Sequence, residues 1–192
     1  MDYNDIAKKL KTNLNETRYL HSLSVSDTAT TLAQRYNIDQ HKAKLAGLLH
    51  DCAREIPTSS LIDAAKEYHI PIGPIETCQP ILLHAALGAI LAQKKYLIND
   101  TEILDAIKLH TTGKADMTDL AKIIYLADMV EPHRRYDSIN HLRDLIKNST
   151  LDIVMIAAFS ESLSFIIKKG QLIHPQTVLA RNALIAKNIC HG

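Results

Sequence analysis

The spacing of hydrophobic residues along this chain is helical almost throughout. Apolar residues recur every three or four positions, and no segment shows the strict apolar–polar alternation of a half-buried strand. The first long helix is expected to run from a cap at Asn15 or Thr17 to about Tyr36. Its inward-facing residues are expected to be Leu20, Leu23, Ala29, Leu32 and Ala33.

Polar caps and prolines divide the rest of the chain into further helices. The expected helices are residues 43–55, capped by Asp39 and stopped before Pro57; 58–68; 81–95, after Pro80; 102–110, opened by Asp100 or Thr101; 119–131, opened by Thr118 and stopped by Pro132; 139–148; 151–169; and a last helix after Pro175. A loop is expected around Pro71, Gly73 and Pro74. The pattern predicts an all-α fold, a single-domain bundle over residues 1–192.

Charge and composition narrow the possible partners. Lysine and arginine (22) nearly balance aspartate and glutamate (21), which argues against wrapping of nucleic acid and against adsorption to a membrane. No stretch approaches the roughly 18 uncharged apolar residues of a membrane span, and the N-terminus lacks the apolar core of a signal peptide. The three cysteines have no CxxC spacing, so a disulfide framework is not indicated. A cytoplasmic protein is expected.

Several ionisable residues lie where the helical pattern is most apolar. They are His21, His50, Asp51, His84, His110 and Asp128. Taken singly, a histidine in such a place is more often a hydrogen-bonded core residue, and an aspartate a helix cap or the partner of an arginine. Six together indicate a metal site in a bundle core, because a dication neutralises carboxylates and accepts imidazole nitrogens.

The order of these six residues resembles the HD superfamily of metal-dependent phosphohydrolases. An HD dipeptide alone arises often by chance, whereas the full H…HD…H…H…D series is far more specific. The segments LLHAALGA, KLHTTG, LADMVEPHRRY and TVLARNALI further resemble the bacterial YqeK-like branch, the symmetrical bis(5′-nucleosyl)-tetraphosphatases. The resemblance covers essentially the whole chain. It implies an HD-type helical bundle, a two-metal centre that usually holds iron, and hydrolysis of diadenosine tetraphosphate to two ADP.

The resemblance also implies how the ligands divide between two metals. His21, His50, Asp51 and Asp128 would hold one ion, while His84, His110 and the shared Asp51 would hold the other. Asp51 can bridge because a carboxylate has two oxygens, which makes it the expected catalytic bridging ligand. Ligation by nitrogen and oxygen without thiolate suits iron, manganese or zinc, and the sequence does not choose among them.

A polyphosphate substrate needs cations beyond the metals. Arg18 lies three residues before His21, on the same side of its helix, and Arg54 follows His50 by four and Asp51 by three. Arg54 is therefore a second candidate catalytic residue. The expected substrate-binding residues are Arg18, Thr111, Thr112, Gly113, His133, Arg134, Arg135 and Arg181. Each arginine could instead be a solvated surface charge with no role in substrate binding. The Thr111–Gly113 turn could likewise be a simple C-terminal stop of its helix.

Three functions stay open at this point. The first is a two-metal hydrolase of dinucleoside polyphosphates, with a nucleotide as its partner and ADP as its product. The second is an HD phosphohydrolase of another nucleotide. The third is a non-enzymatic iron-binding sensor, which the arginines disfavour because a closed metal site has no use for them. A proton donor is not marked, although His133 and Glu131 are candidates. The oligomeric state also stays open, with a homodimer as one possibility.

Overall fold

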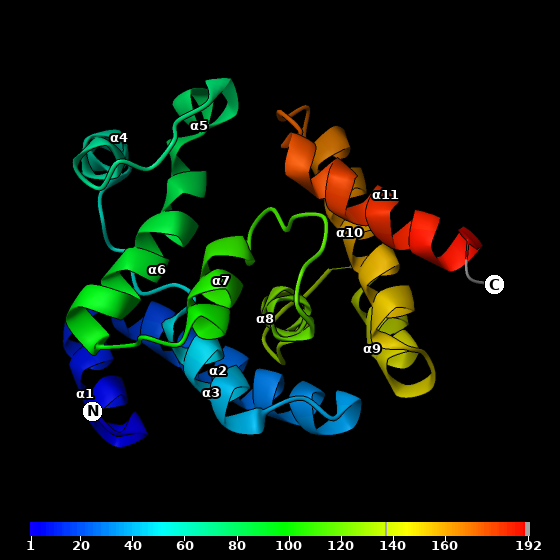
Figure 1. Ribbon diagram of the computed structural model, residues 1–192, viewed down its shortest axis with the longest axis horizontal. Helices are drawn as coiled ribbons and strands as arrows, with labels where there is room; N and C mark the ends of the chain where they lie inside the picture. Colours follow the sequence, from blue (N-terminus) through cyan, green and yellow to red (C-terminus); the bar gives the residue numbers. More distant parts are fainter. Residues whose placement is uncertain (137, 191–192) are drawn as a thin grey trace.

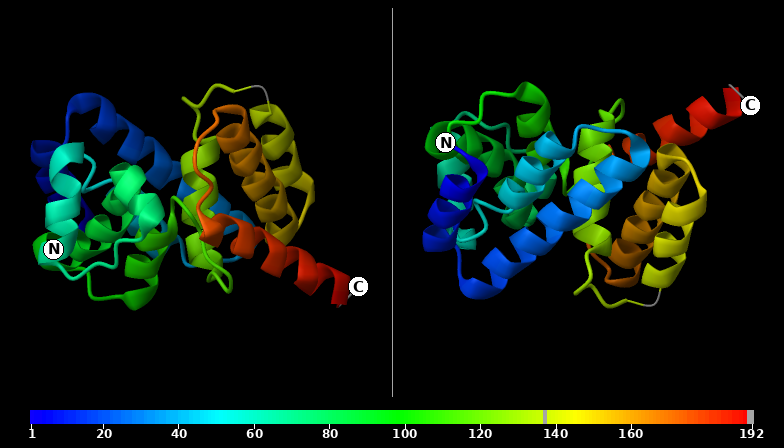
Figure 2. Two further views of the ribbon diagram at one scale, coloured as in Figure 1. Left: turned by 90° about the horizontal axis from the view of Figure 1, so that it is seen from above. Right: turned by 90° about the horizontal axis from the view of Figure 1, so that it is seen from below.

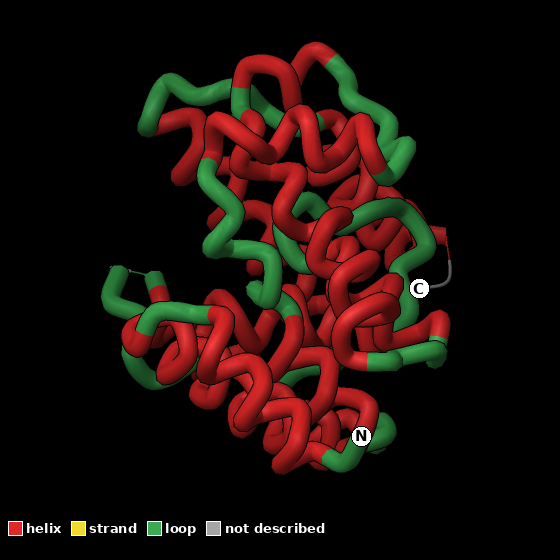
Figure 3. The backbone as a smooth tube through the Cα atoms, turned by 90° about the vertical axis from the view of Figure 1, so that its left-hand side faces the viewer, coloured by secondary structure: helices red, strands yellow, loops and turns green. Residues whose placement is uncertain are grey.

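The computed structural model describes residues 1–136 and 138–190, and over these ranges it contains helices, turns and no strand (Figure 3). The all-α prediction is therefore confirmed. The elements in chain order are α1 (Tyr3–Asn13), α2 (Glu16–Tyr36), α3 (Gln40–Leu49), α4 (Thr58–Glu67), α5 (Pro74–Cys78), the short 3-10 helix η1 (Pro80–Leu82), α6 (Leu83–Tyr96), α7 (Thr101–Leu109), α8 (Asp119–Val130), α9 (Ile139–Asn148), α10 (Leu151–Lys168) and α11 (Pro175–Cys190).

Helix α8 lies in the middle of the molecule, between α1–α7 on one side and α9–α11 on the other (Figures 1 and 2). It contacts α2, α3 and α7 on one side and α10 on the other. Its run from Leu120 to Ala127 is buried without interruption, as is expected of a helix that is covered all round. No helix in the described part is both long and apolar enough to cross a bilayer. The single domain over residues 1–192 stays a prediction.

The polar caps predicted from sequence are confirmed at four helix starts. The side chain of Asn15, rather than Thr17, accepts the backbone N–H of Arg18 at the start of α2. Asp39, Asp100 and Thr118 cap α3, α7 and α8 in the same way. Each cap satisfies backbone donors that have no partner inside the helix, so these starts are determined locally.

Three expectations about the helices are wrong. α3 ends at Leu49, and residues 50–55 form turns rather than the helical extension predicted to residue 55. α5 occupies part of the predicted loop after Pro71, and Leu20 on α2 is 54% exposed instead of inward. Leu20 lies five residues before the buried Val25, about 140° around the helix from it, so it misses the buried stripe.

A further helix was not predicted at all. In α1 the charged residues of the N-terminal segment alternate with apolar ones, which hides the periodicity. The helix nevertheless buries Ile6, Ala7 and Leu10, and Asp2 and Asp5 form a capping box at its start. One buried stripe of three residues is enough to attach α1 to α2 and α3, with which it is in contact.

Close packing of α2 against α3 is made possible by Gly47. A Cβ atom at this position would lie 2.9 Å from the Cα of Ser26, a distance that real side chains do not show. The two backbones can approach only because Gly47 has no side chain, and this approach brings His21 of α2 beside His50 at the end of α3, with ring centroids 5.2 Å apart.

Replacing Gly113 with alanine should destabilise the fold for two reasons. Gly113 has a φ of 63°, in the left-handed region, and a Cβ there would lie 2.8 Å from two ring carbons of Phe159. Conformational strain and overpacking together should lower the free energy of unfolding by about 2–4 kcal/mol, measured by urea denaturation. Gly170→Ala is the matched control, because Gly170 has a φ of 62° and nothing within 4 Å of a Cβ. It should cost only about 1 kcal/mol, and equal losses would show that Phe159 imposes no steric limit.

Candidate active site

Six predicted ligands converge from α2, α6 and α8 and from the residues that directly follow α3 and α7. His21 lies on α2 and Asp128 on α8, His50 and His110 follow the last residues of α3 and α7, Asp51 is in the turn after His50, and His84 is near the start of α6. Their ligand atoms form three groups, each within 4.8 Å: His21, His50 and Asp51; His50, His110 and Asp128; and Asp51, His84 and His110. The structure therefore brings together all six residues that the sequence singled out.

Asp51 lies between two sets of histidines. Its Oδ1 atom is 3.1 Å from Nε2 of His84 and 3.7 Å from Nε2 of His110. Its Oδ2 atom is 3.7 Å from Nε2 of His50 and accepts a hydrogen bond of 2.9 Å from Arg18. The residue is only 4% exposed. Each carboxylate oxygen thus faces different imidazoles, which is the arrangement that a bridging ligand needs.

Three histidines are oriented by the same local device. The Nδ1 atom of His50 is 2.7 Å from the carbonyl oxygen of Gly47, and that of His110 is 2.7 Å from the carbonyl oxygen of Ile107. Nδ1 of His84 faces the carbonyl oxygen of Ile81 in the same way. A carbonyl can only accept, so each Nδ1 donates its proton and each Nε2 of the neutral ring keeps a lone pair. Such a second contact is what aligns metal-binding histidines in proteins.

The free nitrogens point to a cation at this position. Nε2 of His84 and Nε2 of His110 are 3.2 Å apart, and two lone pairs repel at that distance unless a cation binds them both. The buried Nε2 atoms of His21 and His50 have no hydrogen-bond partner, although that of His21 is 3.0 Å from Oδ1 of Asp128. Buried polar atoms are rarely left in this state. The donor set therefore fits a transition-metal centre.

Burial and neighbouring charges set the protonation of these groups. Burial lowers the pKa of His50 to about 4, so its imidazole is neutral and able to act as a ligand. Burial alone would raise the pKa of Asp51, but the nearby imidazoles of His50, His110 and His84 hold it well below its usual range. The pKa of Asp128 is likewise low, because His21, His50 and Arg134 outweigh its burial. His50, Asp51 and Asp128 are therefore in the charge states that a metal requires. Burial alone would lower the pKa of His110, but the contact with Asp51 outweighs burial and raises it.

Arginines balance the two aspartates and face the same space. Arg18 contacts Asp51, and Arg134 donates to both the carboxylate and the backbone carbonyl of Asp128. Arg54 is half-buried, and burial together with the neighbouring Arg18 lowers its pKa, while Asp51 and Asp128 oppose this effect. Arg54 is therefore close enough to both carboxylates to add positive charge to the site.

A pocket of about 790 Å³ opens beside Asp128, between α8 and α10. Four of the predicted substrate-binding residues line it: Thr111, His133, Arg134 and Arg135. Its other walls, which the sequence did not indicate, are formed by Met129, Tyr136, Ser138, Glu161, Ser162, Ser164, Phe165, Ile166 and Lys168. We call this space the α8–α10 pocket. Because Asp128 belongs both to the histidine–aspartate cluster and to this wall, a ligand in the pocket would reach the cluster directly.

Known proteins resemble this chain over most of its length. The HD domain family matches residues 18–132. The symmetrical bis(5′-nucleosyl)-tetraphosphatase of Bacillus subtilis is 35% identical over 92% of this chain and 94% of that protein. The enzyme of the same name from Staphylococcus aureus is 35% identical over 90% of this chain and 89% of its own.

The chain belongs to the HD family.

A solved HD structure supports the assignment. The crystal structure of a predicted HD superfamily hydrolase involved in NAD metabolism, from Clostridium acetobutylicum, is 40% identical, has a TM-score of 0.92 and covers 97% of this chain and 98% of that one. Within the HD family, the relatives place this chain in the symmetrical bis(5′-nucleosyl)-tetraphosphatase branch, so the predicted resemblance is confirmed. The protein is an enzyme of the hydrolase class, and the non-enzymatic sensor is set aside. The role of each site residue stays a prediction.

Not every predicted substrate-binding residue of this HD protein lies at the α8–α10 pocket. Arg181 on α11 donates its Nε–H to Ser160 of α10 at 2.7 Å and is not part of the pocket wall. Gly113 ends the turn after α7 in the left-handed conformation, as a plain helix stop does. The carbonyl of Thr112 accepts a hydrogen bond from Thr177, so this part of the turn attaches α11 to the rest of the chain.

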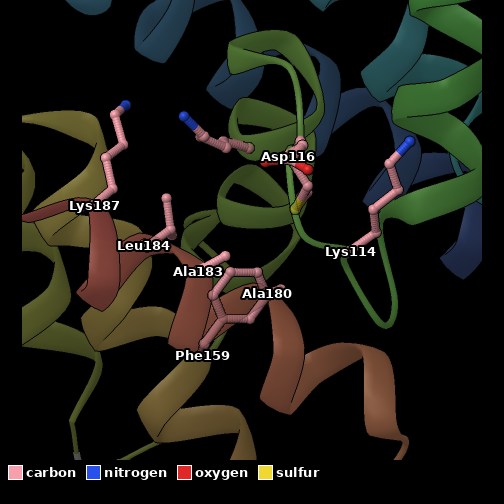
Figure 4. Close-up of a pocket in the computed structure, with 9 residues that line it drawn as sticks. Lys114, Asp116, Phe159, Ala180, Ala183, Leu184 and Lys187 are labelled. Atoms are coloured by element: carbon pink, nitrogen blue, oxygen red, sulfur yellow. The ribbon is translucent and has the colours of Figure 1, made fainter.

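A separate pocket of about 420 Å³ lies between the start of α8, α10 and α11 (Figure 4). Lys114, Lys122 and Lys187 line it, with Phe159 among its apolar residues. Lys122 and Lys187 both contact Asp152, at 2.7 Å each, so much of their charge is neutralised. None of the six cluster residues lines this space, which separates it from the HD site.

Glu131 contributes to the cluster in a way that the sequence did not reveal. It is buried, and its Oε1 atom lies 3.4 Å from Nδ1 of His21. Its Oε2 atom accepts hydrogen bonds of 2.8 Å from the hydroxyl of Ser24 and from the backbone N–H of His133. The sequence feature that could have identified Glu131 is its position three residues after Asp128 and directly before Pro132. Glu131 thus orients His21 rather than serving as a free proton donor.

Replacing Glu131 with glutamine should weaken metal binding while the fold survives. A glutamine has one acceptor oxygen, which would face Ser24 and His133, and its NH2 group cannot accept the N–H of His21. Loss of such an orienting contact typically costs about 10- to 100-fold in metal affinity, which a titration of chelator-treated protein with Mn²⁺ would measure. Glu55→Gln is the control, since Glu55 is exposed and, among the described residues, accepts a side-chain hydrogen bond from Asn15 alone. Equal Mn²⁺ affinities in the two variants would show that Glu131 does not orient His21 for metal binding.

Proposed function

We propose that this HD protein is a two-metal hydrolase that cleaves diadenosine tetraphosphate, and related dinucleoside polyphosphates, into two ADP. The observation that carries the proposal is the position of Asp51, whose two oxygens face different histidines. The names of the relatives supply the substrate class. A cytoplasmic location, where such nucleotides occur, goes with this function as a prediction.

Two transition-metal ions fit the cluster, with iron as our first choice and manganese or zinc as alternatives. His84, His110 and Oδ1 of Asp51 would hold one ion, while His21, His50, Asp128 and Oδ2 of Asp51 would hold the other. When bound, such a metal pair supplies an activated hydroxide and positive charge beside the phosphate that is attacked. The protein contributes neutral imidazoles, ionised carboxylates and ring orientations that are set by carbonyls.

The α8–α10 pocket is suited to one ADP unit. Arg134, Arg135 and Lys168 supply positive charge around it, and the guanidinium of Arg134 has donors beyond those used by Asp128. Phe165 is 58% exposed and offers an aromatic surface for a base. An ADP unit with its base against Phe165 and its phosphates beside Arg134 would present its second phosphate to the cluster. Cleavage there divides the tetraphosphate at its centre.

A second candidate function is hydrolysis of a different nucleotide at the same site. The observation in its favour is the description of the Clostridium acetobutylicum relative as involved in NAD metabolism. The same metal cluster would serve either substrate. The choice therefore depends on which phosphate the pocket holds at the metals, and the products of the reaction separate the two.

The bridging role of Asp51 predicts coupled loss of both metals. Protein purified without chelator should contain about two transition-metal ions per chain by elemental analysis. Asp51→Asn removes the shared charge, so its metal content should fall towards zero and its activity by at least about a thousandfold, while its circular dichroism stays helical. His69→Ala and His141→Ala are the controls, because neither residue is in the cluster. An Asp51→Asn protein that keeps both metals and full activity would refute the site.

The products of hydrolysis in oxygen-18 water test the position of cleavage. Diadenosine tetraphosphate should yield ADP as the only nucleotide, with the label on the β-phosphate. Arg134→Ala should raise the KM by about 10- to 100-fold, the usual loss for a charge-assisted contact, whereas the exposed Arg35→Ala should not change it. AMP and ATP in equal amounts would refute symmetrical cleavage and leave the metal site unaffected.

A further inference from the structure

A second pocket adjoins the α8–α10 pocket near the cluster. It has a volume of about 380 Å³ and is lined by Thr58, Gln79, Pro80, Ile81, Leu82, Thr111, Thr112, Ile166, Gln171, Leu172, His174 and Thr177. We call it the η1 pocket, after the helix Pro80–Leu82 that forms one wall. It shares Thr111 and Ile166 with the α8–α10 pocket, so the two spaces meet beside His110.

The η1 pocket lies next to the half of the cluster that contains His84 and His110. The backbone carbonyl of its wall residue Ile81 orients the ring of His84. Thr111, which lines both pockets, follows His110 directly. The α8–α10 pocket instead reaches the cluster through Asp128. The two pockets therefore approach the cluster at different ligands, the α8–α10 pocket at Asp128 and the η1 pocket beside His84 and His110.

The two pockets differ sharply in charge. Five charged residues line the α8–α10 pocket: Arg134, Arg135, Lys168, Asp128 and Glu161. Among the residues that line the η1 pocket there is no lysine, arginine, aspartate or glutamate. Its one titratable side chain, His174, is occupied by Glu76 at 2.9 Å. The η1 pocket is therefore suited to an uncharged group, not to phosphates.

The walls of the η1 pocket match a nucleobase and its ribose. Ile81, Leu82 and Leu172 supply apolar surface. The side-chain amides of Gln79 and Gln171 make no hydrogen bond to another described residue, so their donors and acceptors are available to the edge of a base. A concave site with apolar walls and a few free polar groups is the usual form of a small-molecule site, and the volume lies in the usual range.

We infer that the η1 pocket binds the nucleoside of the second ADP unit, the one that leaves on hydrolysis. This rests on the proposed function and extends it from one nucleoside site to two. The substrate would lie across the cluster, with one unit in the α8–α10 pocket, its central phosphates at the metals and its second nucleoside between Gln79 and Gln171. Two pockets about one cleavage point give a physical basis for cleavage into equal halves.

Comparison of two substrates tests this inference. Diadenosine tetraphosphate has two nucleosides, whereas adenosine 5′-tetraphosphate has one and leaves the η1 pocket empty. Gln171→Ala should raise the KM for diadenosine tetraphosphate about fivefold, as expected for one lost neutral hydrogen bond, and Gln79→Ala/Gln171→Ala should raise it further. Neither change should alter the KM for adenosine 5′-tetraphosphate. Gln93→Ala, the same substitution on the exposed face of α6, is the matched control and should leave both values unchanged.

Equilibrium dialysis with labelled ADP gives a second readout that does not depend on turnover. The purified protein should bind two ADP per chain, and the double variant should weaken one of the two sites only. Binding of a single ADP, or a KM that rises equally for both substrates, would refute the η1 pocket as a nucleoside site and leave the proposed function in place. If the wild-type protein turned over neither substrate, the proposed function and this inference would both be refuted.

Discussion

The structure depends on one electrostatic constraint, the burial of the Asp51 carboxylate at the junction of several helices. An ionised carboxylate of this kind is too costly to bury unless positive charge or hydrogen-bond donors surround it. Arg18 contacts one of its oxygens, and His84 and His110 lie against the other. These partners come from α2, from α6 and from the residue that follows α7. Neutralising a single charge thus requires helices that are far apart in sequence to meet at one point.

The C-terminal ends of α3 and α7 orient two of the imidazoles. Carbonyls in the last turn of a helix lack intrahelical partners. Gly47 and Ile107 lie in such turns of α3 and α7, and their oxygens accept from His50 and His110. A histidine placed directly after a helix therefore satisfies an orphan carbonyl and presents its other nitrogen to the centre. The end of α3 at Leu49, earlier than its hydrophobic pattern suggests, is part of the construction of the site.

Helix α8 connects this centre to the space where a substrate can bind. Its buried length fixes Asp128, while the chain after Val130 turns so that Arg134 folds back onto the same carboxylate. Arg143 of α9 donates to the carbonyls of Val130 and Glu131 and holds that turn. The cluster and the α8–α10 pocket thus share one wall, and a rigid helix sets the distance between the metals and the phosphates that they would act on.

The sequence by itself determined most of the helices, four of their caps and the six candidate ligands. Caps and periodicity are local, so Asn15, Asp39, Asp100 and Thr118 could be identified from a few neighbouring residues. The ligands could be identified because an ionisable side chain in an apolar helical segment is costly to bury without a partner such as a metal ion.

The tertiary structure alone decided which side chains meet. The contact of Glu131 with His21, the position of Arg181 away from the α8–α10 pocket and the exposure of Leu20 depend on how α2, α8 and α11 pack against their neighbours. The same holds for the η1 pocket, whose walls come from segments about a hundred residues apart. Hydrophobic periodicity indicates which face of a helix is buried, but not which element packs against that face. A pocket such as this one is formed by the packing of particular elements against each other.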